Sequence, residues 1–173
     1  MQKLKRITSE YIEAEDRIRI TALTEDDKTM ILWFTLRLMR QLVTHCLNLL
    51  EKHCPDTARA TVTDEKSRSS MQGLVQQSAE QELQQEEAVK AINSSPDYLV
   101  QEVDVNFGNE GVFLIFKEEG AGHSELYLNN QQLRQWLGIM FTLWQKAQWP
   151  VSLWPDWMTG SNNEGPISGT LVH

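Results

Sequence analysis

Side chains that commonly serve as catalysts or metal ligands are scattered along this sequence. Of the four histidines, His45 lies at the edge of the apolar face of a predicted helix and His123 lies in a predicted turn. His53 and Cys54 are neighbours at a predicted helix end, but no second pair of ligands follows at a spacing usual for zinc. We therefore predict no metal site and no catalytic residue.

Carboxylates are numerous but gather in turn-like runs, such as residues 25–27 and 118–119. The first run lacks the alternating oxygen ligands and the closing glutamate of a calcium loop. No glycine-rich phosphate loop and no Gly-x-Ser-x-Gly motif occurs. The sequence therefore predicts no bound cofactor. An enzyme of unfamiliar type, using His45 or His123 beside turn carboxylates, is the least supported alternative.

Arg40 and Arg134 form a matched pair, because each lies on the polar side of a predicted helix and each is followed by glutamine. Either guanidinium could pair with a carboxylate on a partner protein, so both are candidate partner-binding residues. The simpler interpretation is a solvated arginine whose aliphatic stem lies along the edge of the sheet.

Three tryptophans and two prolines stand close together in residues 148–158. Tryptophan and methionine are enriched at protein interfaces, so Trp149, Trp154 and Trp157 are candidate partner-binding residues. The alternative is that this segment folds back and covers the open end of the core.

Three apolar runs between residues 7 and 34 have a period near two, which predicts a three-stranded meander. Thr35 is a suitable helix N-cap. The residues after it carry an apolar stripe at helical spacing, and Pro55 ends this helix because proline cannot continue its hydrogen bonds. The same order of three strands and a helix is predicted between residues 98 and 146, with Asn129 as the N-cap.

Residues 55–97 separate the two units. A polar loop is predicted at 55–70, followed by a Gln/Glu-rich helix at about 71–92 that an Asn-Ser-Ser-Pro sequence ends. The apolar stripe of this helix is thin, which favours packing on one side only or a two-helix contact between subunits. A flexible, partly helical linker is the alternative.

The two units align without a gap at an offset of 94 residues, so that residues 17–53 lie over 111–147. Strand parity, turn length and helical phase all match, and a slip of one residue would turn the apolar side chains of each strand to the wrong face. Identical residues are few, but they include the Arg-Gln pairs at 40–41 and 134–135. We interpret the match as a structural duplication. The competing interpretation is two ordinary units of equal length.

The composition is that of an ordinary globular protein, with 40% hydrophobic and 23% charged residues in a chain of 173. A formal net charge of -8 without a basic stripe argues against nucleic-acid binding. No apolar run reaches the roughly 20 residues of a membrane span, and the first residues are not followed by the apolar core of a signal peptide. We expect a reduced, cytoplasmic protein that binds neither nucleic acid nor membrane.

The predicted fold is α+β, with two β-β-β-α units at residues 1–54 and 98–158 that share one core, the inserted helix between them, and a disordered tail at 159–173. The leading hypothesis is a non-enzymatic protein-protein interaction or assembly module that forms a homodimer, with the inserted helix or the tryptophan-rich segment as contact surface. The alternative is a small-molecule-binding regulatory module whose pocket lies between two sheets and is walled by tryptophans.

Overall fold

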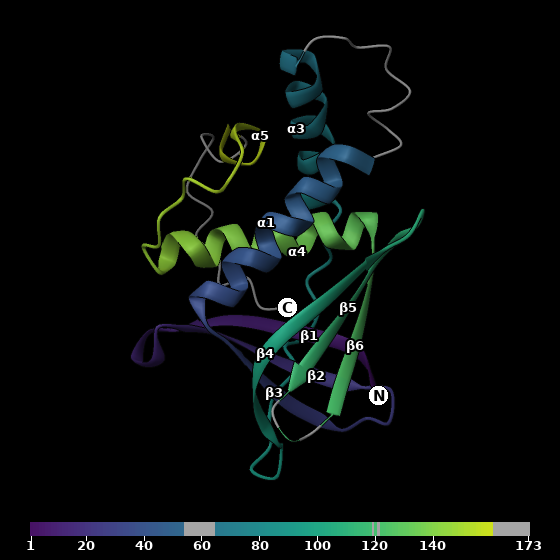
Figure 1. The fold of residues 1–173 in the computed structure, drawn as a ribbon, viewed down its shortest axis with the longest axis vertical. Helices are drawn as coiled ribbons and strands as arrows, with labels where there is room; N and C mark the ends of the chain where they lie inside the picture. The colour runs from purple at the N-terminus through teal and green to yellow at the C-terminus, as the bar shows by residue number, and fades with distance from the viewer. Residues whose placement is uncertain (54–64, 119, 121, 161–173) are drawn as a thin grey trace.

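The computed structural model describes residues 1–53, 65–118, 120 and 122–160 of the chain. In this part of the chain, six strands close into one barrel, and helices lie over one end of it (Figure 1). The strands are β1 Gln2–Ile12, β2 Arg17–Thr24, β3 Thr29–Phe34, β4 Asp97–Phe107, β5 Gly111–Glu118 and β6 Gly122–Asn129.

Neighbouring strands around the barrel follow the order of the chain. β1–β2–β3 and β4–β5–β6 are antiparallel meanders, and two short parallel contacts, β3 with β4 and β1 with β6, join them into a ring. The expectation of two sheets with a pocket between them is therefore wrong. The parallel contacts pair the outer strands of both meanders, so the six strands form a single sheet closed on itself.

The second and third strands of the two meanders pair in the same register at an offset of 94 residues. The first strand is displaced by two further residues, since Ile7 pairs with Ala22 in one meander and Val103 pairs with Phe116 in the other. Ile20 pairs with Leu32 in the first meander, and Leu114 pairs with Leu126 in the second. Each residue of the second pair comes 94 residues after its counterpart in the first. At the parallel contacts, Leu32 lies beside Tyr98 and Leu126 lies beside Leu4. Here Leu126 corresponds to Leu32 and Tyr98 corresponds to Leu4, again with a difference of 94 residues.

The first strand of each meander contains a register shift. β1 shifts just before Arg6, and β4 shifts just before Glu102. Beyond the shift, Arg6 faces Leu23 on β2, and Glu102 faces Lys117 on β5, which is 94 residues after Leu23. Arg6 and Glu102 therefore occupy matching places on the outer surface of the barrel.

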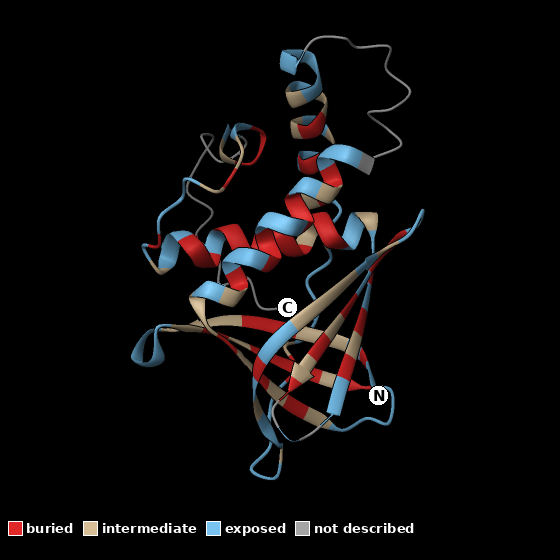
Figure 2. Ribbon diagram, viewed as in Figure 1, coloured by how far each residue is buried: buried red, intermediate tan, exposed pale blue. Residues whose placement is uncertain are grey.

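The interior of the barrel is packed with apolar side chains, as the alternation predicts. Ile18, Ile20 and Ala22 of β2 are fully buried, and Figure 2 shows buried positions recurring along the strands. Phe34 and Phe116, one from each meander, meet with ring centroids 5.5 Å apart and planes at 82°. This edge-to-face arrangement is a favourable geometry for aromatic pairs. The same core continues into the helices above the barrel.

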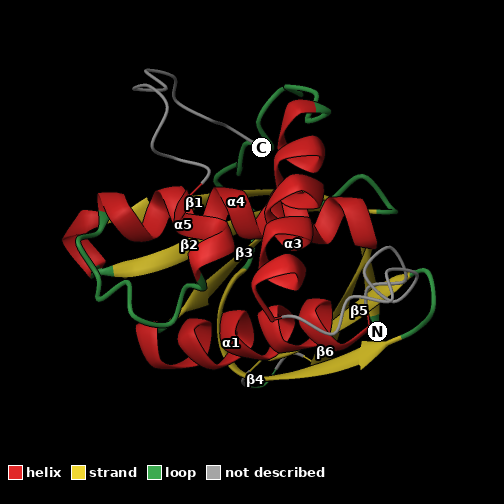
Figure 3. Ribbon diagram, turned by 90° about the horizontal axis from the view of Figure 1, so that it is seen from above, coloured by secondary structure: helices red, strands yellow, loops and turns green. Residues whose placement is uncertain are grey.

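Helices α1 (Leu36–His53) and α4 (Asn130–Lys146) follow the two meanders and lie over the end of the barrel (Figures 1 and 3). Both predicted N-caps are present. Thr35 Oγ1 accepts a hydrogen bond at 3.3 Å from the amide three residues on. Asn129 Oδ1 accepts from Gln132 N at 2.8 Å, and Gln132 Oε1 accepts from Asn129 N at 3.0 Å, which completes a capping box.

The inserted helix, α3 (Glu65–Gln81), packs against α4. The prediction of a helix at about 71–92 is wrong at both ends, because α3 begins earlier and ends earlier. Residues 82–92 lie outside any helix and reach the barrel surface, where Val89 N donates a hydrogen bond to Thr8 Oγ1 at 2.8 Å. Contacts with the barrel outweigh the helix propensity of this Gln/Glu-rich run.

The mixed α and β content of the prediction is confirmed. The loop predicted at 55–70 is helical from residue 65 on, and residues 55–64 lie outside the described part of the chain. The tail predicted to be disordered at 159–173 lies outside it from residue 161, while Thr159 ends the short helix α5 (Asp156–Thr159).

Candidate functional site

Helix α3 is held on α4 by hydrogen bonds from amide side chains to backbone and carboxylate oxygens. Gln76 Nε2 donates to the carbonyl oxygen of Arg134 at 2.9 Å, and Gln135 Nε2 donates to that of Ala79 at 2.9 Å. At the end of the contact, Gln131 Nε2 donates to Glu82 Oε2 at 2.6 Å. Figure 3 shows α3 crossing α4. Because the side-chain amides of each helix donate hydrogen bonds to backbone carbonyl oxygens of the other, this is a polar and specific helix-helix contact.

Arg134 is buried in this contact, with only 2% of its surface exposed. Its Nη2 donates to Gln72 Oε1 at 2.5 Å, and its guanidinium lies 5.7 Å from the centre of the Trp157 ring. Gln72 in turn donates from Nε2 to the carbonyl oxygen of Leu50 on α1 at 3.1 Å. The prediction of a solvated arginine is therefore wrong for Arg134, because α3 and α5 cover the polar side of α4.

Gly138 lets a side chain of α3 lie directly against α4. A Cβ atom at this position would stand 2.8 Å from Glu80 Oε1, so the end of the Glu80 side chain would have to move aside. Glu80 is held there by Gln76 Nε2, which donates to Glu80 Oε1 at 2.8 Å. Four residues of α4, namely Gln131, Arg134, Gln135 and Gly138, therefore form the surface that receives α3.

The residues of α1 at the matching positions, 94 residues earlier, are all exposed. We call these four residues the α1 face: Arg37, Arg40, Gln41 and Thr44. They line an open, shallow groove of about 890 Å³ together with Leu36, His45 and Asn48. Figure 2 shows exposed positions recurring along α1. Arg40 thus matches the sequence prediction of an exposed arginine, and Arg134 does not.

The opposite side of α1 is an ordinary core surface. Met39, Val43 and Cys46 are fully buried. Burial raises the pKa of the Cys46 thiol to about 12, so the thiol stays protonated at neutral pH and is a poor nucleophile. Cys54, the other cysteine, lies outside the described residues.

Two further grooves lie where a helix passes the first strand of a meander. The β1–α4 groove, about 790 Å³, lies between β1, β6 and α4, and Leu83 from the stretch after α3 lines it. The β4–α1 groove, about 530 Å³, is lined by residues 101–106 of β4 and by Leu38, Gln41, Leu42 and His45 of α1. The α1 residues of the β4–α1 groove correspond, at an offset of 94 residues, to four α4 residues of the β1–α4 groove. These α4 residues are Gln132, Gln135, Trp136 and Ile139.

The three tryptophans singled out in the sequence are buried: Trp149, Trp154 and Trp157 are 5–7% exposed. Trp144 makes edge-to-face contacts with Trp149, at 4.9 Å between ring centroids, and with Trp154, at 5.7 Å. The geometry is that of a segment folded back over the core, which is one of the two interpretations of the sequence. A role in partner binding stays a prediction, and a partner could reach these rings only after the segment moved.

Among the residues that the structure describes, the other titratable side chains do not assemble into a reactive site. His45 and His123 are both exposed, and the described residues contain no group of three or more His, Cys, Asp or Glu side chains placed to hold a metal ion. Glu118 and Ser124 hydrogen bond to each other at 2.5 Å, but both are buried, so a substrate cannot reach the hydroxyl.

Comparison with known proteins gives no relative from which to transfer a function. No protein-family model, curated protein or solved structure matches this chain. None of the helices in the described part of the chain combines the length and apolarity needed to cross a bilayer. The case for a function therefore depends on the geometry of the α1 face. Of this face, the sequence predicts only Arg40 as a candidate partner-binding residue. The i,i+4 spacing of Gln72, Gln76 and Glu80 was the available signal for the α3 contact.

Proposed function

We propose that this chain is a non-enzymatic protein-binding module whose α1 face receives a helix of a partner protein, as α4 receives α3. One observation carries the proposal. The four α4 residues that receive α3 have counterparts on α1 at one fixed offset, and all four counterparts are exposed. Arginine and glutamine are retained at the two central positions, Arg40 and Gln41, where they match Arg134 and Gln135.

The proposal includes a structural duplication of the β-β-β-α unit, since only then do the two helix surfaces correspond. Its support is the shared offset of the β2–β3 and β5–β6 pairings, which relates Ile20–Leu32 to Leu114–Leu126. The parallel contacts of the barrel follow the same offset. An assembly with a second copy of the chain stays a prediction from the sequence, and the crosslinking experiment below separates a second copy from a different protein by the mass of the adduct.

The test is site-specific crosslinking in the cells that make the chain. A photo-crosslinking amino acid is placed at Thr44, at one end of the α1 face and one helical turn from Arg40, and at Lys146 as an exposed control position on α4. We expect a discrete adduct from Thr44 and none from Lys146, and we expect Arg40→Glu to abolish it. The protein identified in the adduct must then bind the purified chain with the same dependence on Arg40.

Crosslinking from Thr44 that Arg40→Glu leaves unchanged would contradict the proposal, as would equal adducts from both positions. Either result would mean that the α1 face does not select a partner.

A further inference from the structure

We infer that the partner of the α1 face is a helix followed by an extended stretch, with a basic residue where the chain's own insert carries Glu86. This inference rests on the proposed function and adds the chemistry of the partner. It follows from how the insert binds the second half of the molecule, and from the charges that differ on the first half.

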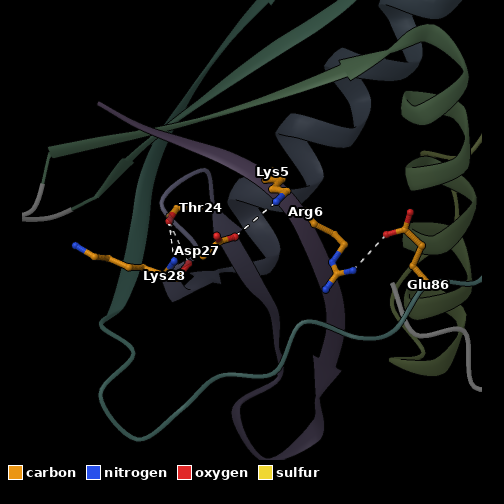
Figure 4. Close-up of polar contacts among 6 residues, drawn as sticks. All are labelled: Lys5, Arg6, Thr24, Asp27, Lys28 and Glu86. Atoms are coloured by element: carbon orange, nitrogen blue, oxygen red, sulfur yellow. Dashed lines mark hydrogen bonds and ion pairs between the residues drawn. The ribbon is translucent and has the colours of Figure 1, made fainter.

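The insert binds with two successive parts. Helix α3 lies on α4, and the stretch after it continues along β1, where Leu83 enters the β1–α4 groove. The Glu86 carboxylate lies 3.5 Å from Arg6 Nη1, and Figure 4 shows this pair reaching across from the insert to β1. Three residues further on, Val89 is buried, and its backbone N donates a hydrogen bond to Thr8 Oγ1 of β1. The insert therefore binds to two surfaces at once, the polar side of α4 and the outer side of β1.

The β4–α1 groove offers the corresponding pair of surfaces on the other half. Its helix wall carries Gln41 of the α1 face, and its strand wall begins with Gln101 and Glu102 of β4. Glu102 of β4 corresponds to Arg6 of β1, because each follows the register shift of its strand. Their pairing partners, Lys117 and Leu23, are 94 residues apart. A segment bound to the α1 face would therefore meet Glu102 at the place where the insert meets Arg6.

The charge at this place is reversed. Lys117 Nζ lies 2.9 Å from a carboxylate oxygen of Glu102 and 2.9 Å from one of Asp104, so two carboxylates share one ammonium group. The side chains of Glu102 and Asp104 are 63% and 44% exposed and remain open to a second cation. Lysine or arginine in the partner complements this pair, whereas glutamate would be repelled.

A second difference concerns the helix part of the partner. Glu80 of the insert lies against Gly138, and the α1 face has Thr44 at that position. A threonine side chain there competes for the space that the end of Glu80 uses on α4, and the end of a glutamate side chain would have to move aside. A small residue of the partner helix fits best at this place. An amide or carboxylate eight residues earlier would accept a hydrogen bond from Arg40, as Gln72 accepts one from Arg134.

These requirements exclude the insert of a second copy as the preferred partner. That insert would bring Glu86 toward Glu102 and Glu80 toward Thr44. The contact of Glu86 with Glu102 is repulsive and that of Glu80 with Thr44 is crowded, so the segment that matches best belongs to a different protein.

The test uses synthetic, fluorescein-labelled peptides of residues 65–89 and the full-length protein, with binding followed by fluorescence anisotropy. One peptide carries Glu80→Ala, and its matched partner carries Glu80→Ala with Glu86→Lys. We expect the lysine peptide to bind about fivefold more tightly, the order of change given by replacing a repulsive surface pair with an attractive one. Glu102→Lys in the protein should reverse the preference, Glu102→Gln should remove it, and Arg40→Glu should weaken both peptides.

Equal binding of both peptides, with dependence on Arg40, would overturn the inference about charge and leave the proposed function standing. Absence of binding by either peptide, with an Arg40-dependent crosslink from Thr44, would overturn the inference that the partner resembles the insert. Absence of both the binding and the crosslink would overturn the proposed function itself. Thermal melting of each protein variant establishes that it is folded before binding is measured.

Discussion

Arg40 and Arg134 lie at matching positions of two helices, 94 residues apart, yet Arg40 is exposed and Arg134 is 2% exposed. The cause is not in the helices themselves, since each arginine precedes a glutamine and each helix follows a pair of strands with the same pairing register. It is the insert, which covers α4 and leaves the first part of α1 open.

This difference predicts unequal costs for the same substitution. Arg134→Met should lower the free energy of unfolding by about 2–4 kcal/mol, because Gln72 Oε1 would lose its donor in a buried site. Arg40→Met, the matched control, should change it by less than about 0.5 kcal/mol. Urea denaturation measures both. Equal effects would contradict the assignment of one buried and one open surface.

Close backbone packing around Gly111 gives a second prediction. A Cβ atom at Gly111 would lie 2.3 Å from the carbonyl oxygen of Leu128 on β6, so Gly111→Ala must displace the strand. We expect a loss of about 2–3 kcal/mol in the free energy of unfolding. Gly108→Ala is the control, because the nearest atom to its Cβ would be 3.8 Å away, at an ordinary contact distance. A similar loss from both variants would show that the turn, and not this contact, requires glycine.

The tryptophan-rich segment should contribute to stability as part of the core. Trp154 packs edge-to-face on Phe141, at 5.1 Å between ring centroids, and on Trp144, at 5.7 Å. Trp154→Ala should cost about 3–5 kcal/mol of the free energy of unfolding. Val151→Ala in the same segment should cost little, because Val151 is 48% exposed. A Trp154→Ala protein as stable as the parent would instead favour a contact role for the segment.

Glu118 predicts a dependence of stability on pH. Burial raises the pKa of its carboxyl group, while the Ser124 hydroxyl, His123 and the N-terminal amino group act in the opposite direction. The folded protein therefore holds a proton that the unfolded chain releases near pH 4.3, so this group's contribution to stability falls as pH rises through the raised pKa. Glu118→Gln cannot titrate and should gain stability over the parent as pH increases from 4 to 7.

Thermal melting across this pH range measures the effect, and Ser124→Ala provides a check of the opposite kind. Without the donated hydrogen bond, the pKa of Glu118 should rise further, so the Ser124→Ala protein should lose more stability with rising pH than the parent does. A difference between Glu118→Gln and the parent that is constant with pH would contradict the raised pKa.

Much of the fold could be predicted from local patterns. The alternation of Ile18, Ile20 and Ala22 correctly predicts a strand with one buried face, and Asn129 is a helix cap as its type and position indicate. These features depend on neighbouring residues only. Closure of the barrel could not be predicted, because periodicity tells which side of a strand is buried but not that β1 lies beside β6.

The surfaces that matter for function depend on contacts between distant residues. The end of α3 at Gln81 reflects contacts such as Val89 with Thr8, which no local signal reports. The burial of Arg134 likewise depends on Gln72, 62 residues earlier in the chain. The sequence pattern indicates a solvated polar side for the helix of each unit, and only the position of the insert distinguishes the two helices.

The central claim, that the α1 face binds a partner segment as α4 binds α3, can be tested directly by NMR. Amide chemical shifts of the labelled full-length protein are followed while the peptide of residues 65–89 carrying Glu80→Ala and Glu86→Lys is added. We predict saturable shift changes at Arg37, Arg40, Gln41, Thr44 and Glu102. Shift changes centred on α4, or spread evenly over the surface without saturation, would contradict the claim.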